Sequence, residues 1–184
     1  MKEMVELEKD YTVLEYLELE KYSTIRHEYY HGKLIPIPGT TLQHNKRAKN
    51  IAKLLDEKLN NNGWETYCLE VKVQAAVNIF SYPDVVLVKK QEQDMQSYFV
   101  TNPFLIVEIL SDTTRKYDFT DKFIQYSKID TLNYYLLVEP DKQVVFLYER
   151  TTGGDWVSHT YTELFEEIKL GLLNTKISLA EIYK

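Results

Sequence analysis

Hydrophobic and polar positions change period several times along the chain, and each change predicts a different element. Residues 41–59 carry apolar side chains at helical spacing, and residues 60–63 follow as a stop signal of asparagines and a glycine. Residues 11–22 open with a capping-box pattern and predict a shorter helix. Residues 111–129 return to a helical period, with Asp118 as the expected N-cap. The pattern therefore predicts three helices separated by extended segments.

Alternating and continuous apolar runs predict the strands between these helices. Residues 27–39 form two extended halves around a glycine, which predicts a hairpin or a bulged strand, and residues 64–77 alternate as one strand. Residues 82–88 and 103–110 are almost continuously apolar, as in strands that are covered on both faces. Further strands are expected at 132–140, 143–151 and 155–163. This order predicts an α/β (α+β) fold with a mixed central β-sheet flanked by helices, an N-terminal helix and extra strands.

Length and composition favour one domain over residues 1–184, with residues 1–25 as an N-terminal helical appendage. The hydrophobic content of 44% and the aromatic content of 13% are sufficient for a sizeable core. Cys68 is the single cysteine, so an intramolecular disulfide is excluded and a reducing, cytoplasmic setting is favoured. The first ten residues lack the apolar region of a secretory signal. No apolar run is long enough to span a membrane, so a membrane is not expected as a partner.

The net charge of −6 is concentrated at one end of the chain. Residues 1–20 contain seven acids and two lysines, and the remaining residues are almost neutral. A near-neutral body can carry a basic groove beside an acidic metal site. The charge therefore does not exclude a nucleic-acid partner.

Two acids interrupt the buried strands, Asp84 in the run 82–88 and Glu108 in the run 103–110. An ionised carboxylate in a dry core costs several kcal/mol, so each acid requires a partner. Because side chains alternate along a strand, Asp84 shares a face with Val86, and Glu108 shares one with Ile106. If the strands are neighbours, the acids converge, and a divalent ion is the simplest cation for two such oxygen ligands. The alternative is that each acid pairs with a lysine, an arginine or a backbone amide.

Several cationic and hydroxyl side chains are candidates for the same site. Lys122, in the following helix, can reach back over the strand ends to orient water or stabilise developing charge; otherwise it is a surface lysine on an amphipathic helix. Tyr126 lies one turn further on the same side, as a site hydroxyl or as plain core. The basic side chains of the long helix, Lys46 and Arg47 among them, form either a solvated face or a phosphate-contacting one.

The ordered series "YPDVVLV", "NPFLIVEILSDTTRKYDFTDKFIQYSKIDTLNYYLLVEP" and "VVFLYER" resembles the Uma-two-type endonucleases. This family, a domain of unknown function common in cyanobacteria, is a branch of the PD-(D/E)XK nuclease superfamily. Upstream, "HEYYHGKLIPIPGTTLQHNKRAKNIAKLL" resembles its first strands and first helix, and "ISLAEIY" resembles its C-terminal signature. The resemblance covers nearly the whole chain and implies a restriction-endonuclease-like fold.

The resemblance also implies roles for individual residues. Asp84 matches the first metal ligand and Glu108 the second, while Lys122 matches the catalytic lysine, since Leu110 stands where that lysine usually lies. Glu28 matches an acid that could hold a metal-bound water or a second ion, and His44 matches a position that the family often fills with histidine. For both Glu28 and His44 a structural role is an equal alternative.

The resulting expectation is a Mg²⁺-dependent (or Mn²⁺-dependent) endonuclease that hydrolyses DNA phosphodiester bonds. Its substrate phosphates would meet Lys46, Arg47, Arg115 and Lys116. A homodimer is compatible with this activity, because cutting both strands of a duplex usually requires two sites. One alternative is a catalytically silent nuclease-fold protein that binds nucleic acid or a protein partner. The other is a structural domain in which the acids form buried ion pairs.

Overall fold

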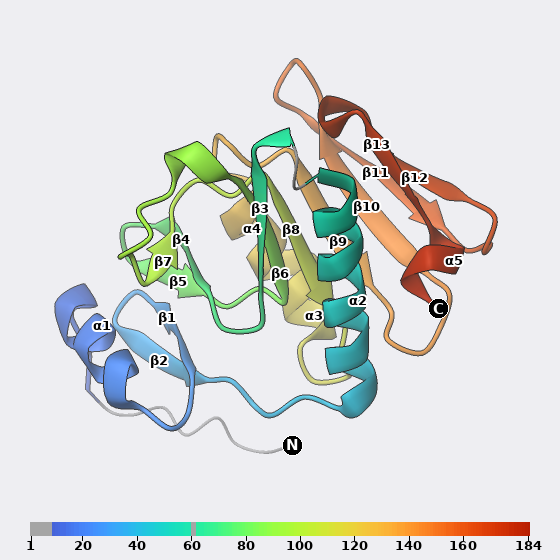
Figure 1. The fold of residues 1–184 in the computed structure, drawn as a ribbon. Coiled ribbons are helices and arrows are strands. Elements are labelled where there is room, and N and C mark those ends of the chain that lie inside the picture. The colour runs from blue at the N-terminus through green and yellow to red at the C-terminus, as the bar shows by residue number, and fades with distance from the viewer. Residues whose placement is uncertain (1–8, 60–61) are drawn as a thin grey trace.

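The central element is a six-stranded mixed sheet in the order β11-β10-β9-β8-β6-β3. A computed structural model describes residues 9–59 and 62–184 of the chain (Figure 1). Strands β8 and β9 pair in parallel, and the other neighbours are antiparallel. The strands are β3 (Trp64–Cys68), β6 (Val85–Lys89), β8 (Leu105–Ile109), β9 (Tyr134–Val138), β10 (Val145–Arg150) and β11 (Trp156–Tyr161). The predicted mixed central sheet and the α/β (α+β) class are therefore confirmed.

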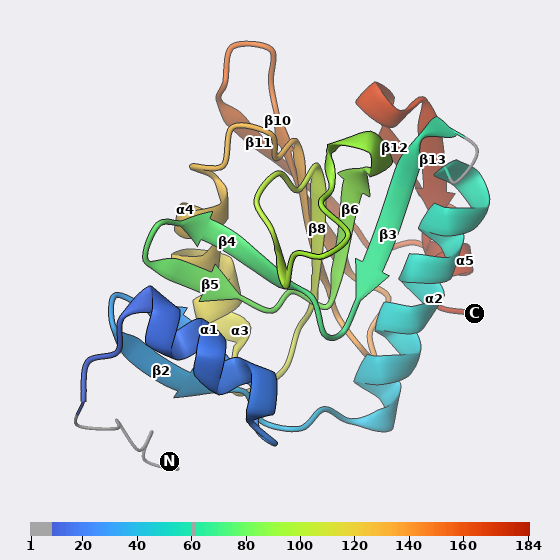
Figure 2. The same cartoon turned by 60° about the vertical axis from the view of Figure 1, so that its left-hand side comes forward.

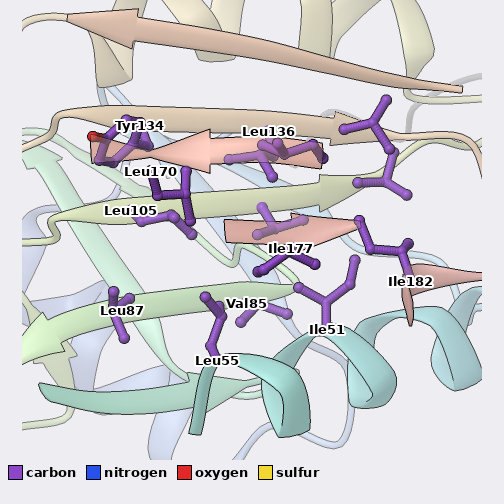
Figure 3. Packing of buried hydrophobic residues seen from close by; sticks show 14 of the residues in the cluster. Ile51, Leu55, Val85, Leu87, Leu105, Tyr134, Leu136, Leu170, Ile177 and Ile182 are labelled. Carbon is purple, nitrogen blue, oxygen red and sulfur yellow. The ribbon is translucent and has the colours of Figure 1, made fainter. Parts of the chain in front are cut away.

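One face of this sheet is covered by α2 (Leu42–Leu59), the helix that the apolar spacing predicted. Figure 3 shows Ile51 and Leu55 of this helix packed against Val85 and Leu87 of β6. The C-terminal elements complete this layer: β12 (Glu167–Leu170), η4 (Gly171–Leu173), β13 (Thr175–Ser178) and α5 (Leu179–Ile182). Residues 60 and 61 of the expected stop signal lie outside the described residues.

The other face is covered by a short helical segment made of α3 (Arg115–Tyr117), η3 (Asp118–Lys122) and α4 (Phe123–Tyr126). The prediction of Asp118 as N-cap is wrong, because helical structure already begins at Arg115. The Ser111 hydroxyl accepts the Thr114 amide at 3.2 Å and starts the segment one turn earlier. The η3 part is a π-helical turn, and Asp118 is buried inside it.

A second sheet of five strands, in the order β2-β1-β5-β4-β7, lies beside α1 (Val13–Tyr22) (Figure 2). Its strands are β1 (His27–Tyr30), β2 (Lys33–Pro36), β4 (Lys72–Ala76), β5 (Ile79–Ser81) and β7 (Phe99–Val100). The capping box that begins α1 is confirmed, and Tyr16 of this helix stacks on Tyr29 with ring centres 4.9 Å apart. Residues 1–8 of the expected N-terminal appendage lie outside the described residues.

Two turns decide how the extended segments divide between the sheets. The predicted hairpin at 27–39 is confirmed, and both His31 and Gly32 adopt positive φ at its tip. The single strand expected over 64–77 is instead two, β3 in the central sheet and β4 in the five-stranded one. Leu69, with φ of 68°, lies in the turn between them, so the chain changes sheets there. The η2 turn (Lys90–Glu92) follows β6.

No helix within 9–59 and 62–184 is both long and apolar enough to span a membrane.

Candidate functional site

Asp84 and Glu108 meet at the same end of two neighbouring strands. Val85 of β6 pairs with Val107 of β8, so one further step in this antiparallel register sets Asp84 opposite Glu108. The Asp84 Oδ2 atom accepts the backbone N–H of Ile109 at 2.7 Å. The structure therefore brings together the two carboxylates that the strand pattern singled out.

The Lys122 ammonium lies among three carboxylates and is not a surface group. Its Nζ is 2.9 Å from Glu108 Oε1, 3.1 Å from Glu28 Oε1 and 3.5 Å from Asp118 Oδ1. The side chain is buried with these partners, only 6% of the residue being exposed. The π-helical turn containing both Lys122 and Asp118 lies directly over the strand ends, and such turns occur frequently at functional sites.

Neighbouring donors fix the orientation of Glu108 and Glu28, two of the acids around Lys122. The hydroxyl of Tyr126, which is fully buried, donates to Glu108 Oε1 at 3.1 Å. The backbone N–H of Tyr82 donates to Glu28 Oε1 at 3.3 Å. Glu28 and Tyr126 thus belong to the same cluster as Lys122, although Glu28 comes from the distant strand β1.

His44 approaches the cluster from the first turn of α2. Its Nε2 lies 3.3 Å from Asp84 Oδ2, and its backbone N–H donates to the Thr41 hydroxyl at 3.1 Å. Burial lowers the pKa of His44, but the hydrogen bond and charge of Asp84 outweigh that effect, so the pKa is raised. The buried Nδ1 atom has no hydrogen-bond partner among the described residues.

The cluster contains more negative than positive charge, and the pKa values reflect this. Burial raises the pKa of Glu108 well above its usual range, and Asp118, Asp84 and Glu28 add to the rise against the opposing charge of Lys122. Burial lowers the pKa of Lys122, but the charges of Glu108 and Glu28 outweigh it and hold that pKa well above its usual value. A further cation near Glu108 would relieve the repulsion among the carboxylates.

Asp118 is the member of the cluster that the sequence analysis missed as a site residue. Its Oδ2 accepts the Thr114 hydroxyl at 2.7 Å, and burial raises its pKa. Its Oδ1 is near enough to Lys122 for charge attraction but lacks the alignment of a hydrogen bond with it. The signal that could have identified Asp118 is its position four residues before Lys122, which sets both side chains on one side of a helical turn.

The expected phosphate-contacting residues divide into buried and exposed groups. Arg47 is buried: it donates to the carbonyls of Ile182 and Pro140 and stacks over the Tyr183 ring at 4.2 Å. It is therefore committed to the C-terminal segment and is not part of an exposed basic face. Lys46, Arg115 and Lys116 are exposed, and Arg115 forms an ion pair with Glu139.

The donor set fits a divalent ion with few protein ligands. Within the described residues, no three side chains of His, Cys, Asp or Glu are arranged to chelate a metal. Mg²⁺ does not require three, because it typically binds one or two carboxylates, retains several waters and meets substrate phosphates. The paired carboxylates, the raised pKa of Glu108 and the absence of a hydrogen-bond partner for Asp118 Oδ1 among the described residues are consistent with such an ion.

A solved structure matches this fold over most of both chains. It is titled a putative nuclease belonging to DUF820 from Anabaena variabilis ATCC 29413, with a TM-score of 0.77 and 17% sequence identity, covering 94% of this chain and 97% of that one. With its mixed sheet and flanking helices, the protein has the restriction-endonuclease-like fold. A family model described as "Putative restriction endonuclease" matches residues 13–180, and the chain belongs to this Uma2 family.

Two curated relatives come from Synechocystis sp. (strain ATCC 27184 / PCC 6803 / Kazusa). The uncharacterized protein sll1609 is 31% identical over 159 residues, which is 85% of this chain and 88% of the relative. The uncharacterized protein slr1290 is 28% identical over 172 residues, which is 92% of this chain and 90% of the relative. Neither name assigns an activity.

Proposed function

We propose that this protein is a Mg²⁺-dependent endonuclease that hydrolyses DNA phosphodiester bonds at the cluster around Asp84, Glu108 and Lys122. The supporting observation is the convergence of four acidic side chains, three of them buried, around the ends of β6 and β8. Four carboxylates, those of Glu28, Asp84, Glu108 and Asp118, face at most two cations, Lys122 and a protonated His44. Such a cluster favours a bound divalent cation, and membership of the Uma2 family supports a nuclease reaction there.

Asp84 and Glu108 would hold the ion, since their carboxylates lie opposite one another across the two strands. When bound, a divalent ion lowers the pKa of a coordinated water and stabilises negative charge on a phosphate. The Ile109 amide holds Asp84 in place, and the Tyr126 hydroxyl does the same for Glu108. These second partners fix the carboxylate orientations before substrate arrives.

Lys122 carries a proton at Nζ throughout, because the surrounding carboxylates raise its pKa. In the proposed reaction this ammonium orients the attacking water and stabilises charge that develops on the phosphate oxygens. Glu28 holds the ammonium at 3.1 Å and would accept a hydrogen bond from that water. The raised pKa of His44 favours its protonated form beside Asp84.

Exposed basic side chains near the cluster would contact the DNA backbone. Lys116 is part of the helical segment that carries Lys122, and Lys46 follows His44 on α2. Contacts of this kind position a duplex without reading its sequence. Arg115 would have to exchange its ion pair with Glu139 for a phosphate, and Arg47 is omitted because it is buried.

The test combines cleavage with metal binding on the full chain. Supercoiled plasmid and labelled duplex oligonucleotides are incubated with Mg²⁺, Mn²⁺ or a chelator, and Mn²⁺ affinity is measured by calorimetry without DNA. Asp84→Asn retains an acceptor for the Ile109 amide but loses the charge, and Asp130→Asn, at an exposed position, is its matched control. We expect Asp84→Asn to lose both cleavage and Mn²⁺ binding, and Asp130→Asn to retain both.

Equal cleavage and equal Mn²⁺ affinity in Asp84→Asn and the parent protein would reject the assigned site. Salt-sensitive DNA binding by the parent without metal-dependent turnover would instead support the silent, nucleic-acid-binding alternative.

A further inference from the structure

A second polar pocket of about 330 Å³ lies outside the carboxylate cluster, between α1 and the five-stranded sheet. Its walls come from the end of α1, the start of β4, the residue after β5 and the approach to β7. Three cations line it, Lys21, Arg26 and Lys72, against the two carboxylates of Glu20 and Glu70. The pocket therefore has an excess of positive charge, opposite to that of the carboxylate cluster.

Lys72 is the buried cation of this pocket, with 6% of the residue exposed. Its Nζ donates to the Tyr82 hydroxyl at 3.1 Å, and no carboxylate in the described part of the chain lies within ion-pair distance of it. An ammonium has three N–H donors, so one neutral acceptor leaves it poorly satisfied. Burial lowers the pKa of Lys72, which shows the cost of holding this charge away from water.

The carboxylate whose charge acts on Lys72, that of Glu20, is already engaged by other donors. Glu20 accepts the Tyr82 hydroxyl on Oε2 at 2.8 Å, and its Oε1 lies 2.7 Å from His27 Nδ1. Tyr82 therefore lies between Lys72 and Glu20, and its neutral hydroxyl cannot compensate the positive charge of Lys72. An anion entering the pocket would supply the missing charge.

The two remaining cations are able to turn toward such an anion. Lys21 pairs with Glu18, and Arg26 lies 3.6 Å from Glu70, with all four side chains substantially exposed. Exposed pairs of this kind contribute between roughly 0 and 1 kcal/mol, so exchanging them for a phosphate costs little. Tyr98 provides an exposed aromatic ring at the same wall, whereas the Ser97 hydroxyl there is already bonded to the backbone of Phe99.

Tyr82 connects this pocket to the carboxylate cluster. Its hydroxyl binds Lys72 and Glu20, while its backbone N–H binds Glu28, which in turn holds Lys122. Asp84 follows two positions later in the chain. The cationic pocket and the carboxylate cluster are thus joined through one residue, Tyr82. A nucleic-acid strand with one phosphate at the cluster could place a neighbouring phosphate in the pocket.

We propose that this pocket binds a phosphate group of the nucleic-acid strand on which the carboxylate cluster acts, with Lys72 as its central ligand and Tyr98 beneath an adjacent base. The identity of the strand as substrate rests on the proposed function. The pocket volume is within the usual range of small-molecule sites, about 300 to 1,000 Å³, which suits a nucleotide unit better than a single ion. Exposed aromatic rings are common stacking platforms for single-stranded bases.

The test measures binding in chelator, so that cleavage plays no part. Fluorescence anisotropy follows a short labelled single-stranded oligonucleotide, and inorganic phosphate, pyrophosphate and a nucleoside monophosphate are used as competitors. The parent protein is compared with Lys72→Met and with Lys169→Met, a lysine exposed on β12. We expect Lys72→Met to lose about tenfold or more in affinity, as for a charged hydrogen bond, and Lys169→Met to bind like the parent.

Salt dependence gives a second readout that a purely structural lysine would not change. Loss of one phosphate contact should reduce the slope of log affinity against log salt by about 0.7 for a single strand. Thermal unfolding checks the fold: Lys72→Met should be as stable as the parent, because it removes a buried and poorly paired charge.

Equal affinity and equal salt slope in Lys72→Met and the parent would reject the proposal. The nucleoside monophosphate could bind in a Lys72-dependent way while the oligonucleotide does not compete with it. That result would reject the nucleic-acid strand as the ligand and indicate a free nucleotide instead. Absence of cleavage with Lys72-dependent oligonucleotide binding intact would count against the proposed function and leave this pocket supported.

Discussion

Lys122 Nζ lies 2.9 Å from Glu108 Oε1, and the two groups reach each other from different elements, a π-helical turn and the end of strand β8. Both are buried, so neither charge is screened by water as it would be at the surface. The same ammonium also holds Glu28 and lies near Asp118. Lys122 therefore has a structural role as the common counter-ion of three acids, whatever it contributes to chemistry.

Replacing Lys122 by methionine should strongly destabilise the metal-free protein. Removing one partner of a buried ion pair typically costs about 3–5 kcal/mol, because the other charge stays buried without compensation. The free energy of unfolding is measured by urea denaturation at neutral pH. Lys128→Met, at an exposed position of the same region, should stay within about 0.5 kcal/mol of the parent.

The double variant Lys122→Met with Glu108→Gln separates charge from packing. Because it removes both partners of the pair, it should recover part of the lost stability. If Lys122→Met alone were as stable as the parent, Lys122 would not be the counter-ion of this cluster.

Asp118→Asn should weaken divalent-ion binding less than Asp84→Asn. Asp118 contributes negative charge but sits beside Lys122, whereas Asp84 is proposed as a ligand. Loss of a nearby charge acts only through Coulomb attraction, so we expect an effect on the order of tenfold in Mn²⁺ affinity. Calorimetry on both variants, with Asp130→Asn as control, shows which of the two loses more Mn²⁺ affinity. A larger loss in Asp118→Asn than in Asp84→Asn would exchange their proposed roles.

Arg47→Met should lower stability without changing the salt dependence of DNA binding. The Arg47 guanidinium donates to carbonyls of Pro140 and Ile182 and stacks on Tyr183, so its loss removes these charged hydrogen bonds and the ring contact. Gln43 and Asn50 continue to donate to the same two carbonyls. The expected cost is about 1.5–3 kcal/mol, as for hydrogen bonds to a charged group. Lys46→Met, next to it but exposed, should show the opposite behaviour, with unchanged stability and a shallower salt slope. A shallower salt slope in Arg47→Met would return this residue to the phosphate-contacting group.

The pairing of Asp84 with Glu108 could be predicted from the sequence, and the full cluster could not. Period-2 alternation is a local property, so it set each acid on a defined face of its strand. That the acids converge depended on the two strands being neighbours, and the pairing of β6 with β8 meets this condition. The burial of Lys122 depends on a π-helical turn, which leaves no mark in an apolar pattern. For the same reason Asp118 was predicted as a helix cap and not as a neighbour of Lys122.

Contacts between distant parts of the chain explain the other differences. Arg47 has the spacing of an exposed helical residue, but the C-terminal segment covers it from a sequence distance of 135 residues. The alternation over 64–77 continues through Leu69, although the chain there passes from one sheet to the other. The pattern of apolar positions in the sequence indicates which side of a helix or strand is apolar. What covers each side depends on contacts in the assembled fold.

The affinity of the Lys72 pocket for a phosphodiester should fall as pH rises through the lowered pKa of Lys72. Burial lowers this pKa below its usual 10.5, with Arg26 adding to the effect against the charge of Glu20. Below the lowered pKa the ammonium is charged and binds the anion, and above it the neutral amine does not. The other charged groups that line the pocket are Glu20, Glu70, Lys21 and Arg26, and Tyr82 and Tyr98 are its tyrosines. The hydrogen bond with Glu18 raises the pKa of Lys21 and burial raises that of Tyr82, so both shifts are opposite to that of Lys72.

The measurement is oligonucleotide affinity from neutral pH to the usual lysine pKa of 10.5, for the parent, Lys72→Met and Lys169→Met. The oligonucleotide contains only adenine and cytosine, because thymine and guanine titrate in the alkaline range. Its bases and phosphodiesters then keep the same charge throughout, so any change comes from the protein. We expect the parent to be about tenfold tighter than Lys72→Met at neutral pH and to converge with it as Lys72 loses its proton. Lys169→Met should follow the parent throughout. A parent advantage that stayed constant up to pH 10.5 would mean that Lys72 keeps its proton there, contrary to the effect of its burial.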